Sequence, residues 1–251
     1  GEDLRFVQVV QLQSQLLAGQ EKWIESANIY NSLINPKFDL AIRQKAYFES
    51  ARLLYFGGDR LSAIKRLELL FGDLDLKPAF SVTHCILGEA KLQSNRYEGT
   101  AAVAHFNAAL DGPLDENLRA RALWGLGRSY RSLDDTAKSS EFYFKAIEAP
   151  SSDLLRARIL YDDSYMKIRS KRWLEASEGF KSVITIGDVG KPTLLMEQAR
   201  LMQVKSTLGS TNLVEAISLL QQIRNNPGLI LDEAILLMAQ AHVMAENLND
   251  A

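Results

Sequence analysis

Three arginines and a tryptophan between positions 121 and 131 are the strongest candidates for a binding site in this sequence. Arg121, Arg128 and Arg131 are spaced by seven and three positions, and Trp124 lies three positions after Arg121 and four before Arg128. Residues at these spacings share one face of an α-helix. Arginine binds a carboxylate through two parallel hydrogen bonds, and tryptophan anchors apolar groups. The pattern predicts a surface for an acidic peptide, with a solvated helix face and a packed Trp124 as the alternative.

The residue types that carry most enzyme chemistry form no recognisable constellation. We expect His84, His105 and His242 to lie in separate repeats, and no His or Cys spacing is typical of a metal site. Residues 125–127 begin like a dinucleotide-binding loop, but the third glycine is missing and the segment is predicted to be helical. The sequence therefore predicts no enzyme activity, no cofactor and no metal ion.

The composition excludes several classes of partner. The chain has 251 residues, of which 47% are hydrophobic and 24% charged, and its formal net charge is −2. Without a basic excess, no overall field attracts nucleic acid or an anionic membrane. No stretch reaches the roughly 18 consecutive apolar residues that span a bilayer. We therefore expect a protein or peptide partner.

The compartment and the ends of the protein stay open at this stage. Cys85 is the only cysteine, so no internal disulfide forms, which fits the cytoplasm and also many periplasmic helical proteins. The first ten residues carry acidic residues where a secretory signal has basic ones. The chain stops at Ala251, where a further helix should begin. We expect a fragment of a longer protein.

Helical periodicity runs through the whole sequence and predicts thirteen helices. Short segments with Pro, Gly or Asn separate them, so that consecutive helices should pack as antiparallel hairpins. Helix N-caps are predicted at Asp39, Ser81, Asp115, Ser151 or Ser152, and Asp232. The predicted helices cover residues 3–18, 22–34, 38–56, 59–71, 78–93, 96–110, 115–132, 134–148, 151–169, 172–186, 191–208, 211–225 and 229–247.

A small residue recurs early in a helix about every 37 positions. Several of these residues follow a turn-like tripeptide, such as Gly58-Asp59-Arg60 before Ala63 or Lys171-Arg172-Trp173 before Ala176. A fixed period of this size is typical of a solenoid, in which each repeat packs only on its neighbours. We expect one array over residues 1–251, with about six and a half helical hairpins. The small residues are Ala27, Ala63, Thr100 or Ala102, Ser139, Ala176, Ala216 and Ala251.

The repeat at residues 120–150 resembles the tetratricopeptide repeat, a helix–turn–helix of about 34 residues. Leu126-Gly127 followed by Tyr130 matches the first helix of that family, and Pro150 stands where its closing proline belongs. The second helix matches at Ser139, Tyr143 and Ala146. The resemblance covers nearly the whole chain, in divergent units of about 37 residues. It implies an all-α, right-handed superhelical solenoid of antiparallel hairpins.

In this family the first helix of each hairpin lines a concave groove that binds a partner. The equivalent positions here include Phe48, Phe56, Glu89 and Gln93. The paired Lys and Asn residues with which one sub-class binds the C-terminal carboxylate of chaperones are absent, which argues against that activity. The residues that we predict to bind the partner are Arg52, Tyr55, Arg121, Trp124, Arg128, Arg131, Tyr161 and Arg169.

The resemblance implies a non-enzymatic scaffold or adaptor. Two alternatives remain: a structural or self-assembly module of a larger complex, or the non-catalytic regulatory part of a larger enzyme. The amphipathic segment 4–17 is interpreted as the first helix of the first hairpin, with a cap or a docking surface for an upstream region as alternatives. An apolar stripe at Ile235, Met238 and Val243 predicts either a self-association surface or an effect of truncation. We therefore include self-association through exposed terminal helices among the expected interactions.

Overall fold

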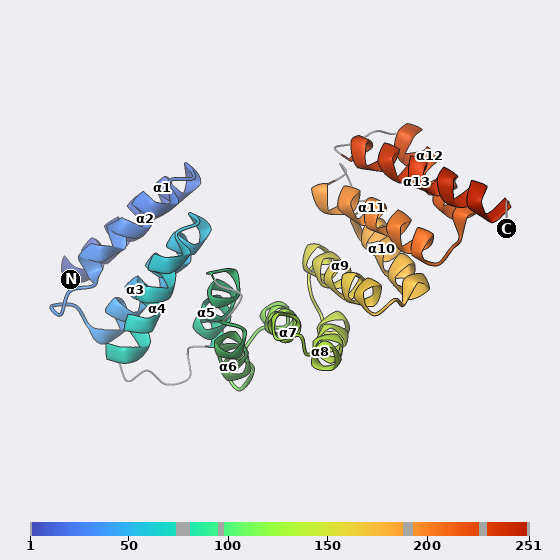
Figure 1. Ribbon diagram of the computed structural model, residues 1–251. Helices are drawn as coiled ribbons and strands as arrows, with labels where there is room; N and C mark the ends of the chain where they lie inside the picture. Colours follow the sequence, from blue (N-terminus) through green and yellow to red (C-terminus); the bar gives the residue numbers. More distant parts are fainter. Residues whose placement is uncertain (1, 74–80, 95–97, 188–192, 226–229, 250–251) are drawn as a thin grey trace. The chain divides into compact units, whose positions relative to one another are not determined.

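Every α-helix expected from the sequence is present in the computed structural model, which describes residues 2–73, 81–94, 98–187, 193–225 and 230–249 (Figure 1). The expected and observed ends agree to about three residues, as is usual for helix termini. One difference is that the helix expected over 22–34 changes to a 3₁₀ helix at Tyr30. The elements are α1 (Glu2–Gly19), α2 (Trp23–Ile29), the 3₁₀ helix η1 (Tyr30–Leu33), α3 (Leu40–Phe56), α4 (Arg60–Asp73), α5 (Ser81–Ser94), α6 (Gly99–Leu110), α7 (Glu116–Ser132), α8 (Thr136–Glu148), α9 (Asp153–Arg169), α10 (Trp173–Gly187), α11 (Leu194–Gly209), α12 (Leu213–Asn225) and α13 (Leu231–Asn249).

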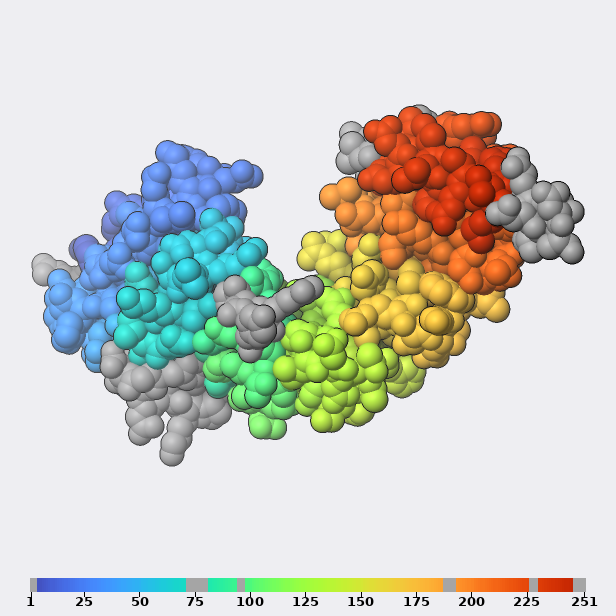
Figure 2. All heavy atoms as spheres, in the orientation of Figure 1, coloured from blue at the N-terminus to red at the C-terminus, as the bar shows by residue number. Residues whose placement is uncertain are grey.

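The helices form two compact units. Unit 1 (Gly1–Asp135) contains α1 to α7, and unit 2 (Thr136–Ala251) contains α8 to α13. Within each unit every helix contacts the next one along the chain, so that the colours follow one another in chain order over the surface (Figure 2). Alternate helices also touch: α3 with α5 and α5 with α7 in unit 1, and α9 with α11 and α11 with α13 in unit 2. The first helices of neighbouring hairpins therefore share one face within each unit.

The turns after α1, α3, α7, α9 and α11 are each built around one residue with positive φ. In each turn the N–H of this residue bonds to the carbonyl three residues back, and the next N–H bonds to the carbonyl five residues back. This Schellman arrangement satisfies the last carbonyls of the helix. Glu21 and Gly58 in unit 1 are 37 positions apart, and Lys171 and Thr211 in unit 2 are 40 positions apart, which explains the tripeptides of the sequence. The tripeptide at residues 95–97 lies outside the described residues. The positive-φ residues are Glu21 (60°), Gly58 (84°), Asp134 (58°), Lys171 (57°) and Thr211 (63°).

The recurring small residues lie in the core. Ala102 is buried and Thr100 is exposed, which decides between the two alternatives for the third repeat. Ala251 lies outside the described residues. Side chains this short allow two helices to approach closely. The small residues with no exposed surface are Ala27, Ala63, Ala102, Ser139, Ala176 and Ala216.

Aromatic rings packed against glycines hold neighbouring helices together. The Phe106 ring of α6 is fully buried between Gly88 of α5 and Gly125 of α7. A Cβ atom at Gly125 would overlap this ring, and one at Gly88 would lie 2.9 Å from it. Trp173, the first residue of α10, packs in the same way on Gly209 at the end of α11. These glycines are therefore needed for close approach.

Two of the predicted N-caps are confirmed by hydrogen bonds. The Asp115 carboxylate accepts from the N–H of Leu118 at 2.8 Å, and the Ser152 hydroxyl accepts from the N–H of Leu155 at 3.4 Å. Asp39 precedes α3 without a side-chain cap bond. Ser81 begins α5 and Asp232 lies in the first turn of α13, so neither stands in the residue before its helix. Among the helices of the described ranges, none is long and apolar enough to cross a membrane.

Candidate functional site

The predicted binding residues lie on first helices in both units. Arg52 and Tyr55 belong to α3, and the cluster from Arg121 to Arg131 belongs to α7, all in unit 1. Tyr161 and Arg169 belong to α9 in unit 2. Because α5 contacts both α3 and α7, unit 1 presents a shared face. We call it the first-helix surface and define it as Arg52, Tyr55, Phe56, Glu89, Gln93, Arg121, Trp124 and Arg128.

A hydrogen-bond network around Glu89 joins the three helices of this surface. The Glu89 carboxylate is 4% exposed and accepts from both Nε and Nη2 of Arg121, the latter at 2.6 Å. The Tyr55 hydroxyl donates to Glu89 Oε2 at 3.2 Å, and Gln93 Nε2 donates to the Tyr55 hydroxyl at 2.8 Å. Each of these hydrogen bonds joins two different helices. The network therefore fixes α3, α5 and α7 relative to one another.

The network also changes the charge that the surface presents. The hydrogen bonds from Arg121 to Glu89 raise the pKa of the arginine, and burial raises the pKa of Tyr55, with a further contribution from the Glu89 charge. Arg121 was expected to bind a partner's carboxylate, but the structure pairs it with a carboxylate of its own chain. Its side chain remains 39% exposed. Arg121 therefore positions the surface and contributes little net charge.

Arg128 stacks on Trp124, one turn away on α7. The guanidinium carbon lies 4.9 Å from the centre of the ring, within the range of a cation–π contact. Both side chains are half-buried. No acidic side chain in the described residues forms an ion pair with Arg128. A cation–π contact leaves the N–H groups of the guanidinium able to donate to an acceptor. Half-buried Arg131 lies three residues further along α7.

The α3 part of the surface is mainly apolar. Arg52 forms an ion pair of 2.7 Å with Glu49 of the same helix, and it lies 6.0 Å from the Phe56 ring. Such exposed pairs contribute little to stability. The Phe56 side chain is 53% exposed. The α3 end of the first-helix surface thus offers an aromatic contact beside a neutralised arginine.

The two predicted residues of unit 2 differ in their surroundings. The Tyr161 ring packs edge-on against Phe180 of α10, with 5.3 Å between ring centres, and burial raises the pKa of its hydroxyl. Arg169 is exposed at the end of α9. Tyr161 therefore contributes mainly to the contact between α9 and α10, which its place in the sequence pattern did not indicate.

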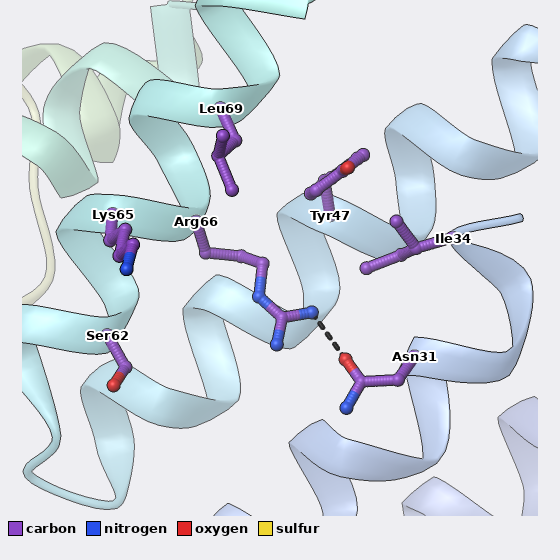
Figure 3. Close-up of a pocket in the computed structure, with 7 residues that line it drawn as sticks. All are labelled: Asn31, Ile34, Tyr47, Ser62, Lys65, Arg66 and Leu69. Atoms are coloured by element: carbon purple, nitrogen blue, oxygen red, sulfur yellow. Dashed lines mark hydrogen bonds between the residues drawn. The ribbon is translucent and has the colours of Figure 1, made fainter.

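A pocket of about 450 Å³ lies between η1, α3 and α4 (Figure 3). Arg66 crosses it and donates to Asn31 Oδ1 at 2.6 Å. A second pocket of about 430 Å³ lies at the equivalent place in unit 2, between α10, α11 and α12, but its lining includes Lys181, Arg200 and Gln203. The two pockets occupy equivalent places between helices, but different side chains line them. We therefore attribute both pockets to the way that neighbouring hairpins pack. The sequence pattern indicated neither pocket.

The expectation that the three histidines lie in separate repeats is wrong. His84 in α5 and His105 in α6 belong to one hairpin, and their Nδ1 atoms are 3.0 Å apart. Burial lowers the pKa of both histidines. The charge of His84 lowers the pKa of His105 further, to about 4. The lateral register of two antiparallel helices decides this contact, and the sequence does not reveal it. The described part of the chain holds no group of three or more His, Cys, Asp and Glu side chains suited to a metal ion.

Comparisons with known proteins identify the fold. The sequence matches no model of a protein family and no curated protein. RapI in its apo form aligns over 97% of this chain and 72% of its own, with a TM-score of 0.71 and 14% identity. PilW, described as a type IV pilus biogenesis factor, aligns over 91% and 98%, with a TM-score of 0.70 and 12% identity. A repeat protein from Cytophaga hutchinsonii, named as containing tetratricopeptide repeats, aligns over 93% and 88%, with a TM-score of 0.68 and 15% identity. The chain has an all-α fold of the tetratricopeptide-repeat type.

Proposed function

We propose that this protein is a non-enzymatic scaffold or adaptor, and that the first-helix surface of unit 1 binds a peptide or protein partner. The observation that carries the proposal is the stack of Arg128 on Trp124, which presents a cation without an acidic partner in the described residues. The repeat-type fold supports it, because a solenoid offers a long surface and no enclosed catalytic pocket.

The chemistry of the surface indicates a partner with a carboxylate next to an apolar side chain. Arg128 can donate two parallel hydrogen bonds to the carboxylate, and Trp124 beside it can contact the apolar group. The network around Glu89 holds the helices in place before binding, which lowers the entropic cost of association. We expect micromolar affinity, about −8 kcal/mol.

We further propose that residues 1–251 are one repeat array. The spacing of the turns supports this proposal. Asp134 is the positive-φ residue in the turn after α7, the final helix of unit 1. Lys171, 37 residues later, is the positive-φ residue in the turn after α9 of unit 2. A net charge of −2 gives no reason to expect nucleic acid as the partner.

The test removes the stack and leaves the fold. Partners captured by the wild-type protein are identified by mass spectrometry, and their affinity is then measured for the Trp124→Ala/Arg128→Ala variant. We expect a loss of about 100-fold, since two anchors are removed. Phe142→Ala/Lys145→Ala is the matched control, because Lys145 also lies 4.9 Å from an aromatic ring but on α8. Equal affinity of wild type and the first variant would contradict the site.

A second candidate function is self-assembly through α1. Leu4, Val9, Leu12 and Leu16 are 49–68% exposed on this helix, and no charged residue occurs from Phe6 to Gly19. Two copies could therefore bring these faces together without charge repulsion. At the other end, Ile235 and Val243 are exposed as expected, whereas Met238 packs on the core.

Sedimentation over a range of concentrations tests self-assembly. We expect a reversible dimer that Leu12→Glu dissociates. Leu174→Glu is the control, because this side chain is 68% exposed on α10 of unit 2. A protein that stays monomeric at every concentration would exclude assembly through α1.

A further inference from the structure

Two histidines of the α5–α6 hairpin are positioned as a chelating pair. His84 and His105 lie on neighbouring helices (Figure 1), with Nδ1 atoms 3.0 Å apart and ring planes inclined by 33°. Two nitrogens bound to one metal ion at about 2.05 Å and at right angles are about 2.9 Å apart, and in a tetrahedral site about 3.3 Å apart. The observed separation is closest to the right-angled arrangement, which Cu²⁺ and Ni²⁺ prefer. The rings need only rotate so that both lone pairs meet at one point.

The hydrogen bond within the pair shows that one Nδ1 presents its lone pair to the other ring. Imidazole binds a metal ion in its neutral form. One Nδ1 donates its hydrogen, and the other accepts it. Binding of both Nδ1 atoms to one ion requires the donor ring to carry its hydrogen on Nε2 instead, and this change of tautomer releases no net proton.

The nearest charges to the pair belong to Lys91 and its partners. Lys91 is paired with Glu68 at 2.9 Å and with Glu98 at 3.3 Å. At His105 the charge of Lys91 lowers the pKa more than the charge of Glu68 raises it. Binding of an ion here therefore depends on the position of the two nitrogens and not on the surrounding charge.

We propose that His84 and His105 bind one divalent transition-metal ion, of the Cu²⁺ or Ni²⁺ class, through their Nδ1 atoms, with water in the remaining coordination positions. The site does not depend on the first-helix surface. It adds a cross-link between α5 and α6, and so it would stabilise the folded hairpin when metal is present.

Titration calorimetry with Ni²⁺ at pH 7 tests the proposal on metal-free protein. The wild type should bind one ion, and His84→Gln or His105→Gln should weaken binding by about tenfold or more, because each leaves a single ligand in place of a chelate. The control is His242→Gln, which removes an exposed histidine of α13 and should bind as the wild type does. Ni²⁺ should raise the melting temperature of the wild type and of this control only. Equal affinity of the wild type and both pair variants would overturn the proposal.

A spectroscopic measurement needs no variant and therefore does not depend on how the substitutions fold. Electron paramagnetic resonance of the protein with one equivalent of Cu²⁺ reports the imidazole nitrogens bound to the ion. Two equivalent nitrogens are expected. One nitrogen, or none, would show that the histidine pair is only a structural hydrogen bond.

Discussion

Glu89 determines how the first-helix surface presents its charge. Its carboxylate is almost fully buried, yet it is paired with Arg121 and accepts a bond from Tyr55. A buried carboxylate needs such partners, because leaving it unpaired costs several kcal/mol (about 3–5 when one partner of a buried pair is removed). The sequence placed Glu89 and Arg121 on the same face, but it could not show that the two residues neutralise each other. Arg128 is therefore the better candidate for binding an acidic group.

Cys85, beside this network on α5, should be unreactive in the folded protein. Burial, and then the charge of Glu89, raises the pKa of its thiol to about 12. The thiolate is the reactive form, so alkylation by iodoacetamide at pH 8 should be about 100-fold slower or more in the native protein than in urea. The unfolded thiol ionises near pH 9, whereas the folded thiol keeps its proton until about pH 12. At pH 8 the folded protein therefore carries much less thiolate than the unfolded protein.

Mass spectrometry of samples quenched over time gives the alkylation rate. A native rate within a few-fold of the unfolded rate would show that the thiol is exposed, in conflict with its 2% exposure.

At the scale of helices, the hairpins depend on turn geometry and on glycines beneath aromatic rings. Of the five positive-φ residues in the described ranges, four are not glycine, although the left-handed conformation costs other residues about 1–2 kcal/mol. The Schellman hydrogen bonds offset this cost. A search for glycine alone would have found only Gly58. The small residue that follows each turn, and not the turn residue itself, made the repeat visible in the sequence.

Gly125→Ala should destabilise unit 1 by about 1–3 kcal/mol, the usual cost of overpacking a core. The added Cβ would overlap the buried Phe106 ring, which also lies against Gly88 and cannot retreat. Urea unfolding followed by circular dichroism measures the change. Gly19→Ala is the matched control, since no atom lies within 4 Å of the Cβ that it would add. A Gly125→Ala protein as stable as this control would contradict the packing described here.

At the scale of the whole molecule, the chain consists of two compact units rather than one core. In a solenoid each repeat contacts only its neighbours, so that stability is a sum of local terms. The boundary between the units falls at Asp135, in the turn after α7. The repeat that best matches the tetratricopeptide motif, residues 120–150, therefore includes this boundary.

Gly209→Ala should loosen unit 2 and leave the start of unit 1 unchanged. The new Cβ would lie 2.6 Å from the Trp173 ring, which joins α10 to the end of α11. Hydrogen exchange read by mass spectrometry should show about 1–3 kcal/mol less protection in α10–α12 and none lost in α1–α4. A uniform loss over both units would show that the chain unfolds as a single cooperative body.

The helices, the repeat and the core positions of the recurring small residues can be predicted from the sequence alone, because these follow from periodicity and from local turn chemistry. Ala63, Ala176 and Ala216 were recognised in this way. Three contacts become visible only in three dimensions: Arg121 pairs with Glu89, Tyr161 packs on Phe180, and His84 bonds to His105. These contacts join different helices, and they depend on the distance and register between those helices. Small residues and rings such as Gly125 and Phe106 fix both quantities in three dimensions.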